Sequence, residues 1–358
     1  MLSQRSSAPR TIAQRQRRTL RFVAIQGYDS TMPDLPNPMP AQPIMQPYAL
    51  LLETPSVRLG DDPSKIAWSG CGPLDVPLEV RGDGLVIFNF EETARFGSPS
   101  IPGWQPEYGK RMPAAIQKAE ALRSEVGYAR FEYMNAWLAA YGSGMSAAAA
   151  HGIISQPPVD PHRHFKAEKQ NGRWIAFNER HTLVAGSEGA SVVNTDVFEH
   201  AVAVMNAAEA KLGEGFTTTL ALLHQASHQY VRHQFASAHL LGWTLTEQAL
   251  HVLWRDYRIG ASSGPDAVTE INRDRRDLLD GRDFTASIIT QILSLAGRIS
   301  DERLTALDAA RKARNNFAHK LKPIEGQQAQ EALATAATML SELLGVRVVA
   351  QLSNTFWM

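Results

Sequence analysis

Apolar residues recur at steps of three and four along a segment near the C-terminal end of the chain. They are Leu304, Leu307, Ala310, Ala313, Phe317 and Leu321. This spacing places them on one stripe of an α-helix, which predicts a helix over residues 301–321 with a buried face. The polar side of that helix carries Arg311, Asn315, His319 and Lys322. Pro323 follows, and proline cannot continue a helix.

Helical spacing also dominates the rest of the second half. It predicts helices over residues 197–212, 217–257, 284–295 and 327–344. Gly213 and Gly345 stand where the first and last of these helices should end, because glycine readily takes the left-handed conformation found there. A polar segment, residues 272–283, precedes the third of them. The second half is therefore predicted to be a helical bundle.

The first half has a mixed pattern. Short apolar runs bounded by Gly, Pro and Asp predict strands at residues 48–53, 76–80, 85–90 and 173–177. Gly82-Asp83-Gly84 separates two of these runs and predicts a tight hairpin turn. A long alanine-rich segment, residues 113–151, predicts a helix between the strands. This order of elements is typical of an α+β domain.

These patterns divide the chain into four parts. Residues 1–46 form a basic and proline-rich segment that we expect to be flexible. Its first part contains arginines and no acid, which suits an RNA-contacting arm, an organellar transit peptide or a plain extension. Residues 47–190 form the α+β domain, a candidate binding site for a regulatory ligand or protein. Residues 191–346 form the helical domain, and residues 347–358 a tail.

Charge and cysteine content narrow the function classes. The chain has 36 basic and 36 acidic residues, so only a local patch can attract nucleic acid. Cys71 is the only cysteine, which excludes an intrachain disulfide and suits a reducing cytoplasm. No run of about eighteen apolar residues predicts a membrane span. We therefore expect a cytoplasmic protein that does not insert into a membrane.

An arginine, a polar residue directly after it and a histidine closing the segment stand together in the predicted helix 301–321. The segment reads Arg314-Asn315-Asn316-Phe317-Ala318-His319. It resembles the R-x(4–6)-H signature of HEPN domains, most closely those of abortive-infection proteins, and the resemblance covers about residues 194–345. The expected fold is thus an α+β N-terminal domain followed by an all-α HEPN-like helical bundle.

The resemblance implies a metal-independent endoribonuclease without a cofactor, acting in antiviral defence or as a toxin-like effector. In such chemistry an arginine holds phosphate oxygens, and a histidine, which titrates near neutral pH, moves a proton. We expect Arg314 and His319 to be catalytic, with Asn315 orienting the imidazole. A non-catalytic HEPN module for dimerisation or for binding RNA or nucleotide is the alternative.

The spacing of the signature also bears on assembly. Arg314 and His319 are five residues apart, about 140° around a regular helix, so one helix cannot easily aim both at one atom. Two facing copies can, which predicts a homodimer with a shared cleft, and the family resemblance implies the same. Four further basic residues would line this cleft and contact RNA, namely Arg311, Lys312, Lys320 and Lys322.

Two other groups of polar residues suggest functions of their own. Glu247 lies on the predicted helix 217–257, where it would either pair with an arginine of the signature helix and support the site or be a plain exposed glutamate. His224, His228 and His239 fall near one face of the same predicted helix, and the first two have a spacing that can bind zinc. No carboxylate or cysteine ligand accompanies them, so we predict no metal site.

Overall fold

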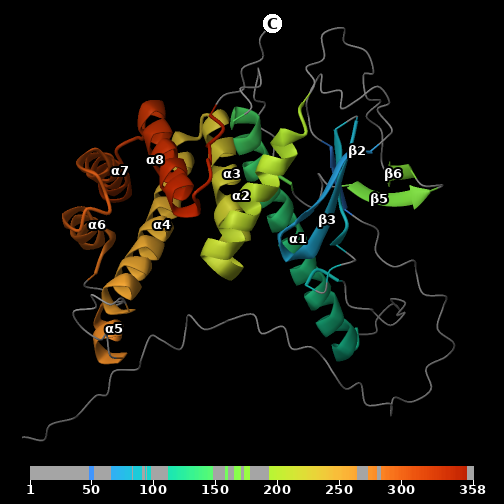
Figure 1. Cartoon of the computed structure of the whole chain (residues 1–358), viewed down its shortest axis with the longest axis horizontal. Coiled ribbons are helices and arrows are strands. Elements are labelled where there is room, and N and C mark those ends of the chain that lie inside the picture. The colour runs from blue at the N-terminus through green and yellow to red at the C-terminus, as the bar shows by residue number, and fades with distance from the viewer. Residues whose placement is uncertain are drawn as a thin grey trace, which may run out of the picture. The chain divides into compact units, whose positions relative to one another are not determined.

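Figure 1 shows the computed structural model of the chain. It describes residues 48–51, 66–82, 84–90, 93, 95–97, 112–147, 158–159, 165–170, 173–177, 193–263, 273–279 and 284–352. All of these residues belong to one compact unit. The predicted flexible segment, residues 1–46, lies outside the described residues.

The strands form one antiparallel sheet. Three neighbouring strands, β2, β3 and β4, follow one another along the chain, and β1, β5 and β6 extend the sheet on the β4 side, giving the order β2-β3-β4-β1-β5-β6. The strands are β1 (Tyr48–Leu51), β2 (Ile66–Gly72), β3 (Val76–Arg81), β4 (Leu85–Phe88), β5 (Phe165–Gln170) and β6 (Arg173–Phe177). The sequence pattern predicted β1, β3, β4 and β6 and missed β2 and β5.

The predicted hairpin between β3 and β4 is present. The two strands pair with Val80 opposite Val86, and the Gly84 N–H donates to the Arg81 carbonyl over 3.0 Å. Gly84 has φ of +85°, a conformation that glycine takes without a steric cost. The side chains of β4 are buried, and the Phe88 ring packs edge-on against Trp137 at 5.7 Å between ring centroids.

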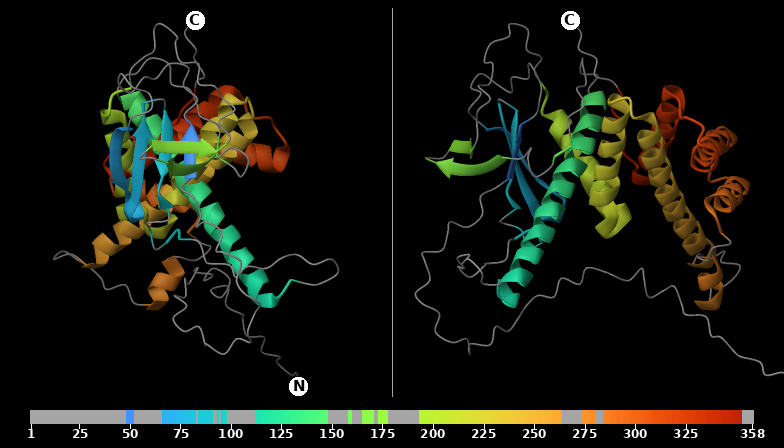
Figure 2. Two further views of the ribbon diagram at one scale, coloured as in Figure 1. Left: turned by 90° about the vertical axis from the view of Figure 1, so that its right-hand side faces the viewer. Right: turned by 180° about the vertical axis from the view of Figure 1, so that it is seen from behind.

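Trp137 belongs to α1 (Ala114–Ala147), which packs against the helices α2 (Asp196–Leu212) and α3 (Phe216–Val231) beside the sheet (Figures 1 and 2). Helix α2 also reaches the sheet, since the Phe198 ring lies 5.5 Å from the Trp68 ring of β2. The aromatic residues of α1 contact both the sheet and the helices, because Trp137 packs against Phe88 of β4 and also stacks on Phe198 of α2. A Cβ atom at position 144 would lie 2.5 Å from the Val197 carbonyl oxygen, so Gly144 permits the close approach of α2.

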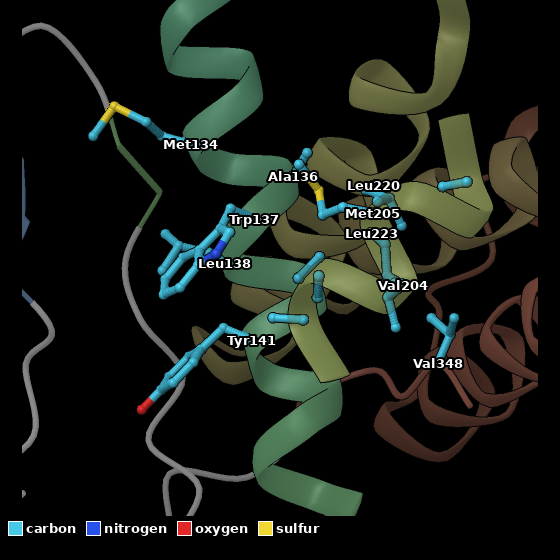
Figure 3. Packing of buried hydrophobic residues seen from close by; sticks show 14 of the residues in the cluster. Met134, Ala136, Trp137, Leu138, Tyr141, Val204, Met205, Leu220, Leu223 and Val348 are labelled. Atoms are coloured by element: carbon cyan, nitrogen blue, oxygen red, sulfur yellow. The ribbon is translucent and has the colours of Figure 1, made fainter. Parts of the chain in front are cut away.

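One hydrophobic core joins the sheet, α1, α2, α3 and α8. Figure 3 shows this core around α1, with Trp137 and Tyr141 on one side and Val204, Leu220 and Val348 on the other. The core contains residues from both sides of the predicted domain boundary at 190/191. Among the described residues the packing therefore does not divide there, and the α+β part and the helical part share their interior.

The remaining helices complete the bundle and build a second core. They are α4 (Phe235–Ser263), α5 (Arg273–Leu279), α6 (Ala286–Leu295), α7 (Asp301–Lys320) and α8 (Gly326–Leu344). Leu250 and Trp254 of α4 pack with Leu293 of α6, Leu307 of α7 and Leu343 of α8. The predicted helices 284–295, 301–321 and 327–344 thus agree with the structure to within two residues at each end.

The single long helix predicted over residues 217–257 is wrong. The chain forms α3 and α4 instead, separated by a turn at Arg232, His233 and Gln234. His233 has φ of +59°, in the left-handed region, which ends α3 and redirects the chain. The turn contains neither glycine nor proline, so the sequence carries no strong local signal for the break.

The segment predicted as a tail begins inside the core. Val348 is buried, and its N–H donates to Ser341 Oγ over 2.8 Å, while the Val349 N–H donates to Ser143 Oγ of α1 over 3.0 Å. The fold is an antiparallel sheet followed by a mostly helical region, as the predicted α+β order implied. None of the described helices is long and apolar enough to cross a membrane.

Candidate functional site

Helix α7 carries the predicted signature, and its two ends are well defined. At the start, Ser300 Oγ accepts a hydrogen bond from the Arg303 N–H over 3.3 Å, which caps the helix. At the end, Leu321 takes a left-handed conformation with φ of +52°. Leu321 is 83% exposed, so its predicted place on the apolar stripe is wrong. The helix has ended before that side chain can reach the core.

The other members of the stripe face the protein interior. Leu307 and Ala310 are buried, while Leu304, Ala313 and Phe317 are half-buried. Ala313 and Phe317 pack against the core that includes α1 and α8. The predicted buried face of α7 is therefore confirmed for these residues, and its opposite face is left for polar groups.

Contacts along α7 define its direction relative to its neighbours. Arg303 near the start of α7 and Tyr257 near the end of α4 line the same cavity, whereas Ala310 contacts His239 near the start of α4. Because α7 and α4 thus run in opposite directions, the last turns of α7 lie toward the N-terminal end of α4. Helix α7 also runs opposite to α8. Arg303, near the start of α7, bonds Glu342 near the end of α8, and His239, which contacts the middle of α7, also bonds Gln328 near the start of α8.

His239 connects three helices. Its ring is fully buried, with Nδ1 3.2 Å from the Gln328 carbonyl oxygen of α8 and Nε2 3.1 Å from the Ala310 carbonyl oxygen of α7. Which ring nitrogen donates depends on the tautomer, because a neutral imidazole has one N–H. Ala310 lies one helical turn before Arg314. His239 therefore holds α7, which carries the signature, at one position along α4 and α8. The sequence alone did not indicate this role.

The signature residues are arranged differently from the prediction. Nη1 of Arg314 donates to Oδ1 of Asn315 over 3.0 Å, and both side chains are half-buried. Within the described part of the chain, the predicted contact between Asn315 and His319 is not formed as a hydrogen bond, and the Asn315 oxygen accepts from Arg314 instead. His319 is exposed in the last turn, and within the described part of the chain its ring has no hydrogen-bond partner. Asn315 thus orients the arginine, not the histidine.

Two of the four predicted RNA-contacting residues already have an acidic partner. Arg311 Nη2 lies 2.7 Å from Asp308 Oδ1, and Lys312 Nζ lies 3.2 Å from Asp308 Oδ2. The hydrogen bonds from Arg311 and Lys312 hold the pKa of Asp308 below its usual value. Lys320 and Lys322 are exposed, and no ion pair is found for them among the described residues. Of the four predicted RNA-contacting residues, the two without an ion pair in the described structure therefore lie at the end of α7 and just beyond it.

Glu247 does not take the predicted supporting role. It is half-buried on α4. The arginines of α7 bond other groups: Arg303 pairs with Glu342, Arg311 with Asp308, and Arg314 with Asn315. The predicted ion pair between Glu247 and the signature helix is therefore absent from the described structure.

The histidines considered as metal ligands are separated by the turn between the helices. His224 and His228 lie on α3, whereas His239 lies on α4 and bonds two carbonyl oxygens. Within the described residues, no three or more His, Cys, Asp and Glu side chains are grouped so that they hold a metal ion.

A cavity of about 460 Å³ lies at the opposite end of α7. Its charged residues are largely paired. Arg303 donates to both carboxylate oxygens of Glu342 over 2.9 and 2.8 Å, and Asp256 bonds Lys211 over 2.7 Å. Burial raises the pKa of Asp256, but the hydrogen bond and charge of Lys211, with Arg255, outweigh this effect and lower it overall. This end of α7 is held together by internal ion pairs.

Comparison with known proteins adds no relative: no family model, no curated protein and no solved structure matches the chain.

Proposed function

We propose that the chain is a metal-independent endoribonuclease of the HEPN type, with a composite active site formed by two copies. The observation that carries the proposal is the arrangement at the end of α7. There an arginine oriented by a neighbouring amide precedes an exposed histidine by five residues. In metal-free cleavage of RNA, an arginine can hold the phosphate oxygens and a histidine can move the proton.

Arg314 is prepared to hold a phosphate. A guanidinium has five N–H donors in a planar fork, and the bond to Asn315 uses one of them. The remaining donors are free to form a bidentate contact with phosphate oxygens, which is stronger and more directional than a lysine contact. Asn315 therefore acts as a positioning residue, because it fixes the plane of the fork.

His319 supplies the proton transfer. Its imidazole accepts the proton of a ribose 2′-hydroxyl while the 2′-oxygen bonds to the adjacent phosphorus. The bond from phosphorus to the 5′-oxygen breaks, and this leaving oxygen takes a proton from water. The products are a 2′,3′-cyclic phosphate and a free 5′-hydroxyl. Exposure of His319 lets the nucleotide and the water reach the ring.

A second copy completes the geometry. Arg314 and His319 point about 140° apart on a regular helix, so the histidine of one copy has to meet the arginine of the other. The exposed ends of two α7 helices would then enclose one phosphate. Lys320 and Lys322 of both copies would add positive charge around it. A role as a defence or toxin-like effector follows from the same resemblance.

One observation favours the alternative, a non-catalytic module that binds RNA. His319 has no hydrogen-bond partner in the described structure that would select its tautomer, whereas catalytic imidazoles are commonly oriented in this way. Such a module would bind RNA through the same basic residues and release no product.

Product analysis separates the two functions. Purified protein is incubated with single-stranded RNA in the presence of EDTA, and the fragments are examined by mass spectrometry. The proposal predicts fragments that end in a 2′,3′-cyclic phosphate and that the His319→Ala protein fails to produce. Cleavage that occurs only after adding zinc or magnesium would refute the metal-free mechanism, and binding without cleavage would establish the alternative.

A further inference from the structure

The turn between α3 and α4 lies at the same end of the bundle as the last turn of α7. A Cβ atom at position 326, where α8 begins, would lie 3.2 Å from the Phe235 ring, where α4 begins. Gly326 follows Lys322 by four residues. The hydroxyl of Tyr230, near the end of α3, also lies 3.5 Å from Gln330 Oε1 of α8. The turn therefore packs beside the connection that leaves the signature helix.

The turn is held in an unusual backbone conformation. His233 has φ of +59°, which is strained for a residue with a side chain. Its N–H donates to the Tyr230 carbonyl over 2.9 Å, and its ring packs edge-on against Phe235 with 5.6 Å between centroids. Both contacts fix the direction in which the exposed imidazole and the adjacent Arg232 leave the protein surface.

The charges at this end are mainly positive and largely available. Arg232 is exposed and, like Lys320 and Lys322, forms no ion pair with any described residue. Two acids on the adjoining segment bond only neutral groups and keep their negative charge, so they offset part of this positive charge. The Glu325 carboxylate accepts from the backbone at the start of α8, and Glu331 Oε1 accepts from Gln327 Nε2 over 2.9 Å.

We propose that Arg232 and His233 form a second RNA-contacting element, which extends the path of a single strand away from the site on α7. Arg232 would bond a phosphate next to the cleaved one, and the flat His233 ring would stack on a base. This inference rests on the proposed function, because it uses the same end of the protein and the same substrate. The α3–α4 turn would contribute to the affinity for RNA, while α7 would carry the residues that cleave it.

Binding measured without cleavage tests this role. Full-length His319→Ala protein is titrated into a fluorescein-labelled single-stranded RNA of mixed sequence, and anisotropy is followed at several KCl concentrations. Arg232→Gln and His233→Gly are added to this background, since glycine retains the positive φ while it removes the ring. Lys118→Gln, on the exposed first turns of α1, is the matched control for charge.

The expected result is binding about tenfold weaker for Arg232→Gln, the usual effect of removing a hydrogen bond to a charged group. Its plot of log affinity against log salt should flatten by about 0.7, because one phosphate fewer is neutralised on the single strand. His233→Gly should weaken binding without changing the salt slope. Lys118→Gln should change neither. If Arg232→Gln and His233→Gly bind as tightly as their parent, the turn has no part in RNA binding.

A cleavage assay on proteins that retain His319 distinguishes failure of this inference from failure of the proposed function. If the wild type cleaves RNA and the turn variants bind normally, the function stands and the turn is excluded. If the turn variants lose binding but the wild type releases no product, the turn binds RNA on a non-catalytic protein. Circular dichroism melting of each variant confirms that the comparison concerns folded protein.

Discussion

The two ends of α7 use charged residues in opposite ways. At the first end, Arg303 is paired with both oxygens of Glu342, and Asp256 is paired with Lys211. At the last end, Arg314 bonds a neutral amide, and no described acid pairs with Lys320. Two ion pairs at the first end therefore satisfy charges internally, although Asp301 and Glu302 there are exposed, whereas the last end presents Lys320 to solvent. A cluster of charged residues thus indicates a binding site only when it is known which of them are already paired with other residues of the protein.

Part of this difference has a simple electrostatic cause. Acids near the start of a helix and cations near its end interact favourably with the helix dipole. Asp301, Glu302, His319 and Lys320 follow that rule. The dipole does not account for the bond between Arg314 and Asn315, since Arg314 lies more than a turn before the end. That bond is the observation on which the proposed site at the last end of α7 rests.

Removal of the proton carrier should have the largest effect. His319→Ala should lower RNA cleavage by roughly 10²–10⁴-fold, the usual contribution of general acid–base catalysis. The side chain is exposed, so the free energy of unfolding should change by only about 0.5 kcal/mol. Cleavage kinetics and urea denaturation measure the two quantities. An exposed histidine on another helix, His251, provides the control, and His251→Ala should leave both unchanged.

Removal of the His239 contacts that join α4 to α7 and α8 should have the second-largest effect on cleavage. His239→Leu removes the bonds to the Ala310 and Gln328 carbonyls and should destabilise the protein by about 1–3 kcal/mol. Because the variant also frees α7 to shift along α4, cleavage should fall at a temperature where the protein is fully folded. Calorimetry and kinetics on the same sample test this. A destabilised variant with wild-type cleavage would show that His239 has no positioning role.

The smallest effect should come from the paired end. Glu342→Gln leaves Arg303 without its acidic partner and should cost about 0.2–1 kcal/mol, as for other exposed ion pairs. Cleavage and RNA binding should remain at the wild-type level, since this end faces away from the proposed site. Denaturation in high salt should reduce the difference from the wild type. A large loss of cleavage would mean that the two ends are not functionally distinct.

Sequence patterns predicted what depends on local spacing. The bounds of α7 and α8 and the glycine ends at Gly213 and Gly345 follow from periodicity and capping preferences. The break at His233 was missed because a left-handed residue other than glycine or asparagine leaves no common signal. Strand β2 was missed because Gly70 and Gly72 interrupt its apolar pattern. At position 72 a Cβ atom would overlap the Tyr133 hydroxyl, a packing requirement between distant segments.

The site was predictable to a similar extent. Asn315 and His319 were placed on the polar side of the correct helix, and Arg314 on the same helix about 140° away from His319. The partner of Asn315 was predicted wrongly, because residues one apart and residues four apart on a helix both offer a bond, and spacing does not choose between them. The bonds of His239 and the position of Arg232 depend on how α4 packs against α7 and α8. Such tertiary contacts lie beyond any local pattern.

Complementation between two inactive variants tests the central claim most directly. Arg314→Ala and His319→Ala proteins are each assayed for RNA cleavage, then unfolded together, refolded as a mixture and assayed again. In a composite site, a mixed dimer retains one arginine facing one histidine, so the mixture should recover a substantial part of the wild-type activity while each parent has almost none. A mixture as inactive as its parents, when wild-type protein refolded in the same way is active, would contradict a site shared between two copies of α7.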